Sequence, residues 1–231
     1  MAQSIQSLIA ASVNGLLREF YPDNYCSLCH AHAIVGANLI SVVLGRVYRP
    51  VAGLALIDCG AGTFFNLTDN AAFANPAGGA FHCWIESVDE SFREKEVVDF
   101  TFRHNRDYAI KNGMQWRREE PPAFLWGPAS KVVIQAEPEN MPPSFPQGML
   151  WLRETDEGWD WITQHMAQNM NAYVTLTSEA LKLLQSQLPP GSPVLAPALT
   201  PRPAATSAAT AGAGASALTP GSAPASVPTP A

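Results

Sequence analysis

The sequence predicts an α+β domain in which one buried helix packs on a mostly antiparallel sheet. Two observations carry this prediction. An almost wholly apolar helical segment lies early in the chain, at about residues 27–44. The segments that follow it are short, rich in β-branched and aromatic residues, and separated by turns containing Gly and Pro. Helices and strands that are segregated along the chain are typical of the α+β class.

The domain is expected to cover residues 1–188 of the 231-residue chain. From Pro189 to Ala231 the sequence is almost entirely Ala, Pro, Ser, Thr and Gly, and it holds half of the 20 prolines. Such a segment has too little apolar side-chain area to offset the entropy of ordering. We therefore predict a disordered tail over 189–231.

Two helices are predicted at the start of the domain. The first has apolar residues at helical spacing from Ile5 to Phe20, which indicates an amphipathic helix. After a turn at Tyr21–Asn24, the second runs from about Ser27 to Leu44 and ends at Gly45. Because apolar residues surround its axis, this second helix is expected to be buried.

Strands are predicted next, at Arg46–Asp58, Gly62–Leu67, Ala80–Ser87, Glu96–Arg103, Lys131–Ala136 and Met149–Arg153. A loop is expected at Asn75–Gly79 and a polar turn at Val88–Lys95. Trp159–Leu188 is expected to be helical, in one or two pieces.

A nucleophile, a base and a carboxylate can be assembled from these elements. If the strands at 80–87 and 96–103 pair antiparallel, His82 and Asp99 lie side by side. A carboxylate bound to one ring nitrogen prepares the other nitrogen to act as a base. Cys29 stands in the first turn of the buried helix, where the helix dipole and a nearby imidazolium both favour a thiolate.

The order of these segments resembles the transglutaminase-like branch of the papain-like cysteine enzymes. The resemblance rests on Cys29 to Ala33 for the helix motif C-x-x-x-A, and on the Gly45–Gly53 strand expected to end at its second glycine. It also rests on His82-x-Trp84-x-Glu86 and on Asp99-x-Thr101 after two valines. It covers about Tyr25 to Arg103 and implies a papain-like fold with Cys29 as nucleophile, His82 as base and Asp99 as orienting group.

The resemblance implies a thiol-dependent hydrolase or acyl transferase acting on an amide or peptide bond of a protein, a peptide or a small amide, without a cofactor. The backbone N–H of Cys29 is one expected oxyanion donor and the side chain of Asn24 is a second. His30 and His32 are unusual neighbours for such a nucleophile. Cys26 is an alternative nucleophile, but only Cys29 stands at the helix start.

Other chemistries fit the same residues. Cys26-Ser-Leu-Cys29-His30 satisfies the C-x-x-C-H haem-attachment pattern, and Cys26, Cys29, His30 and His32 include possible metal ligands. A zinc site lacks its second ligand pair, because Cys59 is isolated and Cys83 is expected to face away from His82. The chain could also be a metal-binding or non-catalytic interaction protein on the same fold.

The net charge and the targeting signals limit the kinds of partner and the location expected for the chain. The formal net charge is −6 and no basic run is present, which disfavours nucleic acid and anionic membranes as partners. Neither a secretory signal nor an apolar run of membrane-spanning length is found. Four cysteines without an export signal favour thiols and a cytoplasmic location, and translocation into another cell would leave the same pattern. The remaining large aromatics, His104 and His165 are assigned to core or surface.

Overall fold

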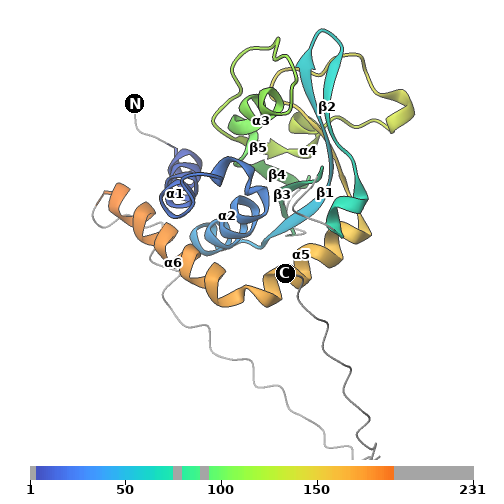
Figure 1. Ribbon diagram of the computed structural model, residues 1–231. Coiled ribbons are helices and arrows are strands. Elements are labelled where there is room, and N and C mark those ends of the chain that lie inside the picture. The colour runs from blue at the N-terminus through green and yellow to red at the C-terminus, as the bar shows by residue number, and fades with distance from the viewer. Residues whose placement is uncertain (1–3, 75–79, 89–93, 190–231) are drawn as a thin grey trace, which may run out of the picture. The chain divides into compact units, whose positions relative to one another are not determined.

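The computed structural model describes residues 4–74, 80–88 and 94–189. The predicted loop at 75–79, most of the turn at 88–95 and all of the predicted tail beyond Pro189 lie outside these residues. The described elements form an α+β fold, as the sequence predicts (Figure 1).

Helix α1 (Ile5–Phe20) forms as its amphipathic pattern predicts. The hydroxyl of Ser4 caps it by accepting a hydrogen bond from the N–H of Ser7. Its apolar stripe, from Leu8 to Leu17, is buried. This stripe packs against α2 (Cys29–Leu44) and α6 (Met170–Gln187).

Helix α2 is the buried helix of the prediction. It begins at Cys29 and ends at Gly45, whose φ of 65° gives the left-handed conformation that glycine adopts without steric cost. The helix lies between the sheet on one side and α1 and α6 on the other (Figure 1). At Gly36, the side chains of Ile85 and Phe100 approach so closely that a Cβ would lie 2.7 Å from each.

The sheet is antiparallel, with strand order β2-β1-β3-β4-β5 and β6 paired to β1. The strands are β1 (Tyr48–Gly60), β2 (Thr63–Leu67), β3 (His82–Ser87), β4 (Glu96–Asp99), β5 (Leu125–Pro128) and β6 (Trp151–Glu154). The predicted pairing of the His82 and Asp99 strands is therefore present, with Ile85 opposite Val98.

The first strand, β1, lies two residues later than the predicted Arg46–Asp58. Gly53, where the family motif would end the strand, lies in the middle of β1 and is paired with His82 on β3 and Glu154 on β6. A Cβ at Gly53 would lie 2.1 Å from the carbonyl oxygen of Arg153. The glycine therefore lets β6 approach β1 closely, which is a different role from ending a strand.

Two predicted strands differ in the structure. The strand expected at 96–103 ends at Asp99, because that carboxylate accepts hydrogen bonds from Thr101 and turns the chain into a short helix, Phe102–His104, followed by α3 (Asn105–Lys111). The strand expected at 131–136 is replaced by the short helix α4 (Ala129–Val132) and a single bridge between Val133 and Leu150. Neither α3 nor β5 was predicted.

The C-terminal helical segment consists of two helices, α5 (Asp156–Gln168) and α6, in agreement with the prediction of one or two pieces. Helix α5 packs on β1, where Gly158 approaches the backbone of Ala52. Short 3-10 turns lie at Tyr25–Ser27, Asn70–Phe73 and Pro138–Asn140. Among the helices of the described residues, none is both long and apolar enough to cross a bilayer.

Candidate active site

Cys29 is the first residue of α2 and lines a cavity of about 520 Å³. The residue before it, Leu28, provides no side-chain cap, and the first helical hydrogen bond runs from the N–H of His32 to the carbonyl of Leu28. The N–H groups of the first turn therefore point beyond the helix end, where they favour negative charge. This is the position that the sequence predicted for an activated thiol.

The side chains of Cys83, His30 and His82 surround the sulfur of Cys29, and their combined effect is to hold its pKa well below the ordinary value. The largest cause is the bond with the Cys83 thiol. Burial opposes the shift, and bonds with His30 and His82, together with the charge of His82, reinforce it. The favoured form of Cys29 is therefore the thiolate.

His82 and Asp99 form a buried pair. Nε2 of His82 donates to Oδ2 of Asp99 at 3.0 Å, and their side chains are 4% and 1% exposed. This bond leaves Nδ1 as the ring nitrogen available to Cys29. Burial alone would lower the pKa of His82, but the charge and hydrogen bond of Asp99 and the interaction with Cys29 outweigh it and raise that pKa to about 10.

Asp99 is held as a carboxylate by its neighbours. Its Oδ1 accepts from the N–H of Thr101 at 2.8 Å and from the Thr101 hydroxyl at 2.6 Å. Burial favours the neutral acid, yet the charge of His82 and these bonds lower the pKa of Asp99. The described geometry is that of a thiolate–imidazolium pair supported by a carboxylate.

The structure thus brings Cys29, His82 and Asp99 together. Asn24 also lines the cavity, from the turn that precedes Cys29. Cys26 lines it too, but this residue lies in the 3-10 turn before α2 and is not among the partners of His82. Between the two candidate nucleophiles, the geometry favours Cys29.

The two unusual histidines are placed differently. His30 lines the cavity and lowers the pKa of Cys29. His32 is buried, and its Nδ1 donates to the carbonyl of Leu28 at 3.1 Å while its Nε2 has no hydrogen-bond partner. Burial lowers the pKa of His32 to about 4, so this ring is neutral at pH 7.

Cys83 lies on the face of β3 opposite His82, as strand alternation predicts. That face packs against α2, so the Cys83 thiol lies close to Cys29, a contact that the sequence did not predict. Burial and the neighbouring Cys29 raise the pKa of Cys83. Cys83 is therefore the hydrogen-bond donor and Cys29 the acceptor.

The other members of the second motif are structural. Trp84 is buried on the far face of the sheet, and its indole N–H donates to Oε1 of Glu86 at 3.1 Å. Oε2 of Glu86 accepts from Arg49 at 3.1 Å and from Lys95 at 2.8 Å. These contacts hold β3 in place.

Several cavity residues were not predicted as part of the site. They come from the segment before β3, from α3 and its preceding turn, and from α5, and they include Phe81, His104, Asn105, Tyr108, Trp161 and His165. No local motif marks them, because they meet Cys29 only after the sheet and helices have packed. Within residues 4–74, 80–88 and 94–189, no group of three or more His, Cys, Asp or Glu side chains has a metal-binding arrangement.

Comparisons with known proteins leave the family open. No protein-family model matches this chain, and no curated protein does. The chain is similar to a solved structure, the crystal structure of genomics APC5867, with a TM-score of 0.52 and 17% identity over 80% of this chain and 79% of that chain. At this level of identity the likeness concerns the fold alone.

Proposed function

We propose that this chain is a thiol-dependent hydrolase or acyl transferase that acts on an amide or peptide bond, on a fold of the papain-like or transglutaminase-like kind. One observation supports this most strongly. Cys29 has a lowered pKa and lies beside His82, whose Nε2 is hydrogen-bonded to the buried carboxylate of Asp99. A nucleophile, a base and a group that orients the base are the parts that acyl transfer requires.

In the proposed reaction, the Cys29 thiolate attacks the carbonyl carbon of the amide. A carbon–sulfur bond forms, and the carbonyl oxygen becomes an oxyanion. The backbone N–H of Cys29 at the start of α2 and the side chain of Asn24 are the proposed donors to that oxyanion. The helix dipole adds to this stabilisation.

The tetrahedral intermediate then collapses. His82 gives its Nδ1 proton to the departing amine, the carbon–nitrogen bond breaks, and an acyl thioester remains on Cys29. Water or a second amine next attacks the thioester, with His82 accepting its proton; the carbon–sulfur bond breaks, the acid or the new amide leaves, and the Cys29 thiolate is restored. Asp99 stays ionised throughout and keeps the ring of His82 in one tautomer and orientation.

The acyl-enzyme is testable with p-nitrophenyl acetate. We expect a burst of one equivalent of p-nitrophenolate and an acetyl group on the Cys29 peptide in the mass spectrum. The variant Cys29→Ala should give no burst, whereas Cys26→Ala should keep it. An acetyl group located mainly on Cys26, or a burst that survives in Cys29→Ala, would refute Cys29 as the nucleophile.

A further inference from the structure

One wall of the Cys29 cavity is aromatic. Trp161 and His165 are stacked at 5.0 Å with an interplanar angle of 15°, and the ring of Phe81 lies 5.0 Å from that of Trp161. His30 meets both members of the stack edge-on, at 5.8 Å from Trp161 and 5.0 Å from His165. Phe81, Trp161, His165 and His30 all line the cavity, and we call them the aromatic wall.

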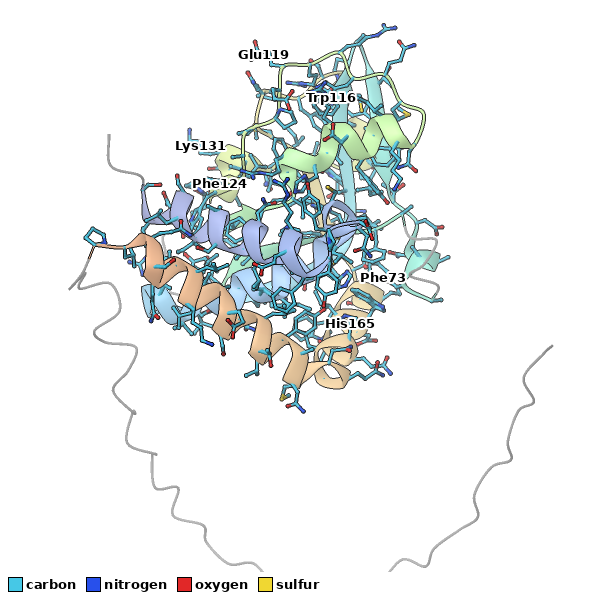
Figure 2. All side chains as sticks on the ribbon, turned by 60° about the vertical axis from the view of Figure 1, so that its left-hand side comes forward. Phe73, Trp116, Glu119, Phe124, Lys131 and His165 are labelled. Atoms are coloured by element: carbon cyan, nitrogen blue, oxygen red, sulfur yellow. The ribbon has the colours of Figure 1, made fainter. Side chains whose placement is uncertain are left out.

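The aromatic wall is assembled from separate parts of the fold. Trp161 and His165 are one turn apart on α5, Phe81 directly precedes β3, and His30 follows Cys29 on α2. Phe73 supports the wall from behind, at 4.9 Å from Phe81 and 6.0 Å from Trp161. Figure 2 shows Phe73 and His165 at the same side of the molecule, beside α5. The rings are thus fixed by packing among three elements.

The side chains of the wall are only half-buried, so part of each ring is open to the cavity. A residue that merely filled the core would be enclosed, as Trp84 is at 1% exposure. Half-exposed, mutually packed rings beside a reactive group are typical of a surface that receives an apolar group.

The described lining of the cavity offers no counter-ion to a charged substrate group. Among the described residues, no Lys, Arg, Asp or Glu side chain lines it. Burial and the neighbouring His30 lower the pKa of His165, so that ring is neutral at pH 7. The imidazolium of His82 already lies between the Cys29 thiolate and the Asp99 carboxylate, so the site has no spare positive charge. A charged group entering this space would lose hydration without gaining a counter-ion.

We infer that the substrate carries an uncharged aromatic group next to the amide, and that this group docks on Phe81, Trp161 and His165. This inference rests on the proposed function and names the substrate class for it. A ring gains edge-on or offset contacts with the wall in addition to the burial of its apolar area, so an aromatic group is favoured over a small aliphatic one.

Two alkylating reagents with the same reactive carbon test this inference: iodoacetamide and N-benzyliodoacetamide. In both, the thiolate forms a carbon–sulfur bond and iodide leaves. Each rate at Cys29 is read by peptide mass and divided by the rate with free cysteine. We expect the benzyl reagent to be favoured about tenfold, from burial of its ring. N-(4-carboxybenzyl)iodoacetamide, which adds a charge, should lose that advantage.

Variants of the aromatic wall test whether its rings cause the preference for the benzyl reagent. Trp161→Leu keeps an apolar side chain but removes the ring face, and should bring the benzyl preference close to one. Phe81→Leu lies on a different element and should lower the preference as well, which guards against a fold defect in either variant. Trp159→Leu is the matched control: it lies on the same helix, is 46% exposed and does not line this cavity, so the preference should remain.

The outcomes separate the two proposals. If iodoacetamide alkylates Cys29 selectively but the benzyl reagent gains nothing, the aromatic site is wrong and the nucleophile stands. If Cys29 is no more reactive than Cys26 toward both reagents, the proposed function fails and this inference fails with it. A benzyl preference that persists equally in Trp161→Leu and Phe81→Leu also overturns the aromatic wall.

Discussion

At the scale of single residues, the thiol of Cys83 is the clearest addition to the site. It is buried, it follows the base His82 directly, and its bond with Cys29 is the largest cause of the lowered pKa of Cys29. Sequence alternation places neighbouring residues on opposite faces of a strand, and from that rule Cys83 was expected to face away from His82. The rule does not predict which face of β3 the start of α2 packs against.

Replacing Cys83 should therefore weaken the activation of Cys29. In Cys83→Ala we expect the pKa of Cys29 to rise, because a hydrogen bond to its thiolate is lost. The pH profile of iodoacetamide labelling at Cys29 should move to higher pH, with slower labelling at acidic pH. Cys59→Ala is the control, since Cys59 is equally buried but is not among the groups that lower the pKa of Cys29. Identical profiles for the wild type and Cys83→Ala would contradict this role.

His32 makes a separate prediction about stability. The pKa of His32 is lowered to about 4 in the fold, against 6.5 when unperturbed. Between about pH 6.5 and 4 the unfolded chain therefore binds a proton at His32 that the folded chain does not bind. The free energy of unfolding consequently decreases as the pH drops from 6.5 toward 4. The full effect is about 3 kcal/mol. Urea unfolding of wild type and His32→Gln across this pH range should show the steeper loss in the wild type, and parallel curves would argue against it.

At the scale of elements, close packing of α2 on the sheet positions Cys29. Gly36 lies two turns along α2 from Cys29, against the side chains of Ile85 and Phe100. Gly36→Ala should cost about 1–3 kcal/mol by overpacking. Gly15→Ala on the exposed side of α1, where nothing lies within 4 Å, should instead stabilise by about 0.5–1 kcal/mol. Thermal unfolding should show a lower melting temperature for Gly36→Ala and a higher one for Gly15→Ala. Equal changes in melting temperature in the two variants would contradict close packing at Gly36.

The helices were predicted more accurately than the strands, for a physical reason. The apolar patterns of α1 and α2, and the positive φ of Gly45, are local features that the fold keeps. The end of β4 was missed because the side chain of Asp99 accepts a hydrogen bond from the backbone N–H of Thr101. Such a side-chain bond competes with the backbone pairing of a strand, and strand propensity does not include it. The short β5 forms only because β4 is there to pair with it.

At the scale of the whole molecule, Asp58 ties β1 to the long segment between α3 and β6. Its carboxylate is buried and accepts from the N–H groups of Gly60 and Phe145, each at 2.7 Å, and from Arg118. Arg118 also donates to the carbonyl of Phe145 at 2.9 Å. This buried charge pair organises residues that have little regular structure of their own.

Removing the Asp58 carboxylate should therefore affect a large region. Asp58→Ala leaves Arg118 without its counter-ion and the N–H groups of Gly60 and Phe145 without their acceptor, and should cost about 3–5 kcal/mol. Limited proteolysis should cut first between residues 114 and 150. Glu120→Ala removes only an exposed ion pair with Arg106 and should cost less than about 1 kcal/mol. Equal stability of the two variants would contradict the structural role of Asp58.

Cys83 and the His82–Asp99 pair together hold Cys29 as a thiolate, and the imidazolium of His82 beside it is the central feature of the proposed site. The most direct measurement is the rate of iodoacetamide labelling at Cys29 from pH 5 to 10, in the wild type, His82→Asn and Asp99→Asn. Wild-type labelling should already be on a plateau at neutral pH, and both variants should shift the rise toward the alkaline range of a free thiol. A wild-type profile that rises only in that alkaline range, or one that neither variant changes, would contradict this role of the imidazolium.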